Sequence, residues 1–168
     1  GMEGLDTRAL TIQLRSKGSM RCMISTRDLD PESLTAKARA LPGMEGQNLV
    51  PFVAAKAPYV FLRNAVQTVS ADKNGRLPFV GSGLRLVVYD YGIKWNIIRL
   101  LKETGFSPVM VPPLFPAEAV RRSGAQGVFL SNGPGDPATL TGEIAIVRDL
   151  MKDFPVAGIC LGHQIIGH

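Results

Sequence analysis

The stretch VAGICLGHQ, residues 156–164, has the pattern of a buried strand that turns sharply at a cysteine and continues as a helix. Gly158 and Gly162 flank Cys160 in a G-x-C-x-G version of the nucleophile elbow. A strand that reverses into a helix within one residue brings the two backbones very close, so side chains at the flanking positions would clash. The stretch therefore predicts Cys160 at a tight strand-to-helix junction.

Cys160 at such a junction has two interpretations. A lone cysteine is most often a buried structural residue. The elbow instead places the thiol over the N-terminus of the next helix, whose partial positive charge and unpaired N–H groups stabilise an anionic sulfur. Those N–H groups, that of Leu161 first among them, also suit an oxyanion formed on an attacked carbonyl. Because both glycines and the strand–turn–helix context are present, we favour a catalytic nucleophile.

The chain before this stretch alternates strands and helices from residue 84 onward. Apolar runs predict strands over residues 84–92, 107–113, 125–130 and 155–162, and the intervening segments predict helices over residues 94–105, 116–124 and 141–154. Such alternation implies right-handed crossovers and a parallel sheet with helices on both faces. We therefore predict an α/β fold over residues 81–168, with a flavodoxin-like doubly wound parallel sheet.

The first 80 residues follow a different pattern. Asp6 and Asp30 are candidate N-caps for two helices, over residues 7–16 and up to residue 41, and residues 19–25 between them suggest a short strand. We expect residues 1–45 to be the remnant of a smaller α+β domain without chemistry of its own. Residues 46–80 are interrupted by prolines and are predicted as a linker with extended segments.

A second functional candidate is SNGPGDP, residues 131–137, at the end of the strand that precedes the cysteine. Gly133 and Gly135 surround Pro134 and predict a rigid loop with bare backbone, which suits contacts to a carbonyl oxygen or a substrate carboxylate. Alone, the same residues are also ordinary turn chemistry. Because function in open α/β sheets collects at the carboxyl ends of the strands, we expect this loop at the same sheet edge as Cys160.

The sequence lacks an evident base for a thiol nucleophile. His163 lies three residues beyond Cys160 on the same predicted helix, and His168 is the last residue. A cysteine triad takes its histidine from another loop, with a third group that orients it. We therefore expect the site to be incomplete within these 168 residues.

Composition limits the function classes. The apolar runs are too short for a transmembrane helix, so no membrane partner is expected. The net charge of +5 comes from scattered basic residues without interleaved aromatic residues, so no nucleic-acid partner is expected. Cys22 and Cys160 lie in unrelated contexts and fit neither a disulfide framework nor a metal site, which favours a reducing compartment, the cytoplasm, and no metal. The loop of residues 131–137 also lacks the Lys and Ser/Thr of a P-loop, which argues against a nucleotide binder.

Together, these motifs resemble a known family. GICLGHQ, residues 158–164, resembles the nucleophile segment of the class I (triad) glutamine amidotransferases. SNGPGDP, YDYGIKWNI (residues 89–97) and DTRALTIQLRSKGSM (residues 6–20) narrow the resemblance to the glutamine-hydrolysing small subunits of carbamoyl phosphate synthetases. The resemblance implies that residues 1–45 are the C-terminal part of a small-subunit N-terminal domain. It also implies that residues 81–168 are the N-terminal part of the amidotransferase domain.

The resemblance also implies roles for individual residues. Cys160 matches the nucleophile that forms a thioester with glutamine, and Gly133 and Gly135 match backbone contacts to glutamine and the oxyanion. Leu161 matches the second oxyanion N–H, and Gln164 matches a polar contact to bound glutamine. Ammonia then passes to a large synthetase subunit, which uses ATP, Mg²⁺ and bicarbonate for arginine and pyrimidine synthesis. No cofactor is therefore expected in this chain.

Family members have more chain on both sides, with a His-x-Glu pair downstream of the cysteine that this sequence does not contain. From this we expect negligible glutamine turnover by the 168-residue chain alone. Two alternatives stay open. One is the amidotransferase component of anthranilate, aminodeoxychorismate or GMP synthesis. The other is a non-catalytic scaffold fragment.

Overall fold

The computed structural model describes residues 2–63 and 65–168, which form two compact units. The first unit is Gly1–Glu45 and the second is Gly46–His168. Within the described residues, no helix combines the length and the apolar character needed to cross a membrane.

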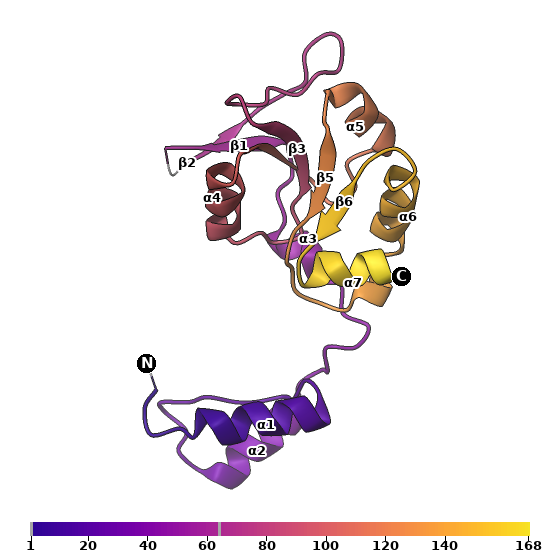
Figure 1. The fold of residues 1–168 in the computed structure, drawn as a ribbon. Helices are drawn as coiled ribbons and strands as arrows, with labels where there is room; N and C mark the ends of the chain where they lie inside the picture. The colour runs from indigo at the N-terminus through magenta and orange to yellow at the C-terminus, as the bar shows by residue number, and fades with distance from the viewer. Residues whose placement is uncertain (1, 64) are drawn as a thin grey trace. The chain divides into compact units, whose positions relative to one another are not determined.

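The first unit contains two helices joined by irregular chain (Figure 1). Helix α1 is Thr7–Lys17 and helix α2 is Pro31–Ala40, so both predicted helices are confirmed. Asp6 accepts a hydrogen bond from Ala9 N and Asp30 from the N–H groups of Glu32 and Ser33, which satisfies N–H groups that have no partner within the helix.

The strand predicted over residues 19–25 is wrong. Among the described residues of the first unit there is no strand, so this part of the predicted smaller domain contributes helices only. A strand needs a neighbour to receive its backbone hydrogen bonds, and this segment has none. It is held instead by Arg21, whose guanidinium donates to the carbonyl oxygens of Arg39 and Leu41 at the end of α2.

The second unit is built on a sheet whose larger part is parallel. Its parallel strands are β3 Leu84–Tyr89, β4 Phe106–Val111, β5 Gly127–Leu130 and β6 Val156–Gly158, in the spatial order β4-β3-β5-β6. This order is the flavodoxin-like one, in which the chain switches direction between its first and third parallel strands. The predicted α/β fold is confirmed, and the switch point lies between β3 and β5.

Residues 46–80, predicted as a linker with extended segments, add two strands to the sheet. They form the short helix α3 Val50–Val53 and the hairpin β1 Tyr59–Leu62 and β2 Ala65–Thr68. Strand β1 pairs antiparallel with β4 through Tyr59 and Met110, which makes the sheet six-stranded and mixed. The cause is burial: Tyr59, Val60 and Phe61 lie in the core of the second unit, where a solvated linker would expose them.

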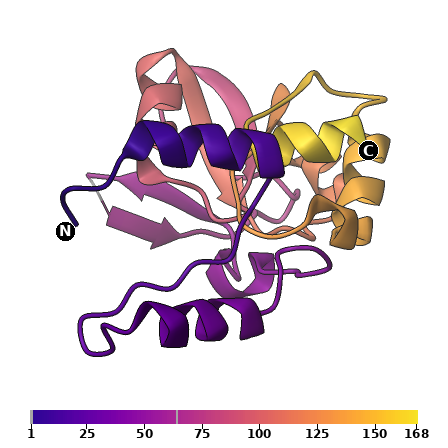
Figure 2. The same cartoon turned by 90° about the horizontal axis from the view of Figure 1, so that it is seen from below.

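Helices cover the two faces of the sheet unequally. Helix α4, Trp95–Glu103, packs against one face through Ile98, with Val88 and Met110 in the same apolar cluster. The other face is covered by α5 Ala117–Ser123, α6 Thr141–Leu150 and α7 Leu161–Gly167. Helix α7 lies beside α6 in both views (Figures 1 and 2). The loops after β3, β5 and β6 meet at the edge where α7 begins.

Candidate active site

Cys160 occupies the predicted elbow between β6 and α7. Its backbone has φ 54° and ψ −116°, a left-handed conformation that residues with side chains rarely adopt, and it is the N-cap of α7. The thiol-bearing residue is exposed. Strained backbone of this kind persists only where the surrounding structure enforces it, and it concentrates at functional sites.

The two glycines of the elbow enforce this turn. A Cβ atom on Gly158 would lie 2.6 Å from the carbonyl carbon of Gly162 and 2.8 Å from His163 N. A Cβ atom on Gly162 would lie only 2.3 Å from Leu130 O, at the end of the neighbouring strand. Both positions therefore exclude any side chain, as the sequence predicts.

Backbone hydrogen bonds join the elbow to the end of β5. Ile159 N donates to Leu130 O at 3.1 Å, and Gly162 N donates to Ser131 O at 3.0 Å. The N–H of Leu161 lies between these donors and has no acceptor among the residues that the structure describes. It is therefore available to an oxyanion beside Cys160, while the Leu161 side chain is fully buried and fixes the helix start.

The loop of residues 131–137 lies against the elbow, as expected from its place after β5. A Cβ atom on Gly133 would meet Leu161 Cδ2 at 2.7 Å and Tyr91 O at 2.5 Å. Gly135, at φ 98°, faces the other way and approaches Gln47 O and Leu49 N. The structure therefore brings Gly133 next to Leu161, and it brings Gly135 next to the chain segment that enters the second unit.

The turn after β3 is organised by Asp90, which the sequence motifs did not single out. Its Oδ1 accepts hydrogen bonds from Gly92 N at 2.8 Å and Ile93 N at 2.9 Å, and its Oδ2 accepts from the hydroxyl of Tyr59 at 3.0 Å. Burial, together with the Asp90 carboxylate, raises the pKa of Tyr59. The Asp-x-Gly pattern of residues 90–92 is the local signal for the turn, but nothing local indicates the bond from Tyr59.

Tyr91 carries a buried hydroxyl group without a hydrogen-bond partner among the described residues. Burial raises its pKa most, and the nearby Tyr89 and Glu143 add to the effect. The phenol therefore stays neutral. The Tyr91 atoms that a Cβ added at Gly133 would meet are its carbonyl oxygen and its Cβ, not its hydroxyl.

The remaining predicted residues lie on α7. Gln164 is exposed one turn beyond the cysteine, and its backbone N–H donates to Cys160 O at 3.0 Å. His163 and His168 are also exposed, on the same helix as the nucleophile. Across the described ranges, no group of three His, Cys, Asp or Glu side chains is arranged to hold a metal ion.

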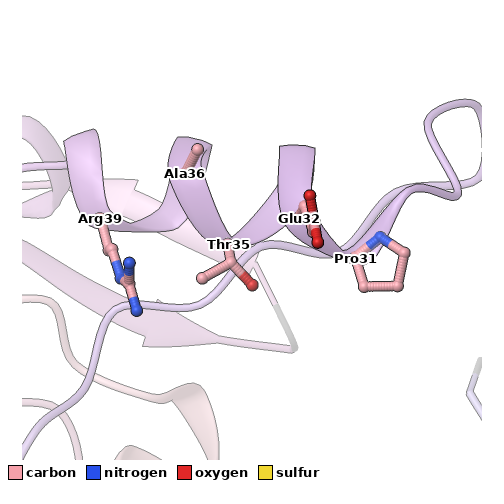
Figure 3. Close-up of a pocket in the computed structure, with 5 residues that line it drawn as sticks. All are labelled: Pro31, Glu32, Thr35, Ala36 and Arg39. Atoms are coloured by element: carbon pink, nitrogen blue, oxygen red, sulfur yellow. The ribbon is translucent and has the colours of Figure 1, made fainter.

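A pocket lies elsewhere, along helix α2 of the first unit (Figure 3). It is lined by Pro31, Glu32, Thr35, Ala36 and Arg39. None of the predicted functional residues lines it. The chemistry that the sequence indicates is therefore concentrated at the sheet edge around Cys160.

Comparisons with known proteins indicate the family. Residues 87–168 match the family model described as glutamine amidotransferase class-I. Over all 168 residues the chain is 61% identical to the carbamoyl phosphate synthase small chain of Desulfovibrio desulfuricans, covering 45% of that protein. It is 42% identical over 167 residues to the small chain of Aquifex aeolicus, covering 99% of this chain and 44% of that protein.

The chain spans about 45% of the length of the curated relatives it matches. Among solved structures, a putative GMP synthase component from Thermoplasma acidophilum matches with a TM-score of 0.43 and 28% identity. That match covers 51% of this chain and 44% of the other.

Proposed function

We propose that this chain, whose residues 87–168 belong to the class-I glutamine amidotransferases, supplies the nucleophile and oxyanion groups of a glutaminase site. The observation that carries the proposal is the strained Cys160 at the start of α7, beside a Leu161 N–H that has no acceptor within the described part of the chain. This pairing of a nucleophile with a free backbone donor suits attack on a carbonyl carbon.

The proposed reaction begins with attack of the Cys160 sulfur on the side-chain amide carbon of glutamine. The S–C bond forms and the carbonyl electron pair moves onto oxygen, where the N–H groups of Leu161 and the Gly133–Gly135 backbone stabilise the charge. The carbonyl then re-forms as the C–N bond breaks. The nitrogen takes up the proton that the thiol gave up and leaves as ammonia. Water cleaves the resulting thioester, which releases glutamate and restores the thiol.

The base that moves these protons is not assigned to a residue of this chain. His163 follows Cys160 on the same helix and is exposed, and a triad histidine is normally presented by a different loop. In the proposal, Gln164 contacts the bound glutamine, because it lies exposed one turn from the nucleophile.

We further propose that the ammonia serves carbamoyl phosphate synthesis, in a complex with a large chain that binds ATP, Mg²⁺ and bicarbonate. Support comes from the 61% identity over all 168 residues to a protein named carbamoyl phosphate synthase small chain. The proposed location is the cytoplasm, since two free cysteines are typical of a reducing compartment.

The test is covalent trapping. The purified protein is mixed with L-glutamine, with and without a carbamoyl phosphate synthase large chain, quenched in acid and analysed by mass spectrometry. We expect a γ-glutamyl thioester on Cys160 and none in Cys160→Ser, formed faster in the presence of the large chain, and no sustained ammonia release by these 168 residues alone. Stimulation by a chorismate-using enzyme instead would reassign the pathway. Absence of any thioester would favour a scaffold role.

A further inference from the structure

The loop of residues 131–137 has no regular hydrogen bonding along most of its length, yet it has to present its backbone accurately. Gly133 and Gly135 donate no backbone hydrogen bond within the described ranges. Their N–H groups are therefore available to a substrate, but nothing in the glycines themselves fixes their direction. The residues that fix it must be their neighbours.

Asn132 holds the start of the loop. Its Nδ2 donates to Gly92 O at 3.0 Å, and its Oδ1 accepts from Lys94 N at 3.1 Å, the N-cap residue of α4. One side chain thus binds a donor and an acceptor on the turn that follows β3. Gly92, at φ 116°, leaves room there for Pro134, whose Cδ would lie 3.4 Å from an added Cβ.

Asp136 holds the end of the loop. Its Oδ2 accepts from Gly46 N at 2.9 Å, and its Oδ1 accepts from Ala138 N at 3.0 Å. Its backbone N–H donates to Gln47 O at 2.9 Å, so Asp136 both donates a hydrogen bond to residues 46–47 and accepts one from them. The two backbone N–H donors hold the pKa of the Asp136 carboxyl below its usual value, which keeps the carboxylate an acceptor.

We propose that Asn132 and Asp136 are positioning residues that hold the Gly133–Gly135 backbone in the orientation that receives the oxyanion. The inference rests on the proposed glutaminase function, and it adds two side chains that never touch the reacting atoms. Gly133 lies close to Tyr91 O and Leu161 Cδ2, beside the elbow. If the loop is released at either end, we expect the N–H groups of Gly133 and Gly135 to change direction relative to Cys160.

The test compares two reactions of the same thiol. With the 4-nitrophenyl γ-ester of L-glutamate, an S–C bond forms at the carbonyl carbon, an oxyanion develops, and 4-nitrophenolate leaves with the bonding electrons. With iodoacetamide, the sulfur displaces iodide at a saturated carbon and no oxyanion develops. In both, the thiol proton goes to solvent. Only the first reaction uses the oxyanion donors.

We expect Asn132→Ala and Asp136→Ala to lower the ester acylation rate by about 10-fold or more, since complete loss of one oxyanion donor costs about 10²–10³. The iodoacetamide rate should stay within about twofold, since the thiol and its helix are unchanged. The matched control is Asp72→Ala. Asp72 also accepts two backbone N–H bonds, from Asn74 and Arg76, but in a loop away from the site, and this variant should alter neither rate.

Each outcome decides between the proposals. If the wild-type protein is acylated by the ester no faster than Cys160→Ser, the glutaminase proposal itself fails. If wild type reacts and the two variants keep its ratio of ester to iodoacetamide rates, the positioning role is overturned. A parallel fall in both rates also overturns it, because the elbow and not the oxyanion loop would then have moved.

Discussion

The two units of this chain are stabilised in different ways. In the first unit, the helices are defined by local contacts: Asp6 and Asp30 cap them, and Lys37 binds Asp28 within the same segment. No residue among positions 2–45 is buried. In the second unit, α5, α6 and α7 are held by a shared apolar core that includes Val87 and Leu130, and α4 packs into a second apolar cluster.

The difference shows that helix caps can set where a helix begins but cannot replace packing in a core. Caps select where a helix begins, but helices of 10 or 11 residues are marginal in water without tertiary packing. The strained turn at Cys160 is the opposite case, because its cost is borne by the packing of Leu161 and Ile165 in the core. Among the described residues, Arg63 and Cys160, the two non-glycine residues with positive φ, both lie in the unit that has a core.

Hydrogen exchange gives the largest expected contrast between the units. We expect amides of β3 and β5 to be protected at least about 10³-fold more than those of α1 and α2, since core elements open only by global unfolding. Peptide-resolved exchange with mass detection measures this. Equal protection in α1 and α2 would break the comparison, and it would mean that another surface covers the first unit.

A matched pair of glycine substitutions tests the same contrast with one added methyl group. Gly162→Ala places a Cβ 2.3 Å from Leu130 O, and we expect a loss of about 3 kcal/mol in unfolding free energy. Gly43→Ala meets nothing within 4 Å, so its effect should be within about 0.5 kcal/mol. Urea unfolding followed by the fluorescence of Trp95, the single tryptophan, measures the first variant, because Trp95 lies in the second unit. Far-UV circular dichroism, to which α1 and α2 also contribute, measures the second. Equal effects would show that the elbow relaxes freely.

The fold was predictable where the pattern is local and repeated. The apolar runs that became β3, β4, β5 and β6 identified the parallel sheet and its helices. Extended segments were predicted within residues 46–80, but their pairing with the sheet was not. The strands β1 and β2 are four residues long and the link to β4 is a single pair, Tyr59 with Met110. The strand over residues 19–25 was predicted wrongly for the opposite reason. Its composition suits a strand, but the described residues offer it no partner strand.

In the candidate site, too, local features were predictable and long-range contacts were not. The elbow around Cys160 was predictable because glycines enforce it within five residues. The contacts of Asp90 with Tyr59 and of Asp136 with Gly46 span 31 and 90 residues, so no local pattern could indicate them. The roles assigned to Gly133, Gly135, Leu161 and Gln164 stay predictions, although the structure places Gly133 directly against Leu161.

The smallest expected effect concerns the acid sensitivity of the first unit. Lys37, Ser33 and the N–H of Asp30 all donate to the Asp28 carboxylate, and together they lower its pKa from 3.8 to about 2. Because the folded pKa is the lower one, this contribution is complete above about pH 4 and is lost as the pH falls toward 2. A carboxyl NMR titration should therefore give Asp28 a pKa near 2, and Lys37→Met should move it toward 3.8, since Lys37 makes the largest contribution. A wild-type value near 3.8 would mean that even the local contacts of the first unit do not persist without a core.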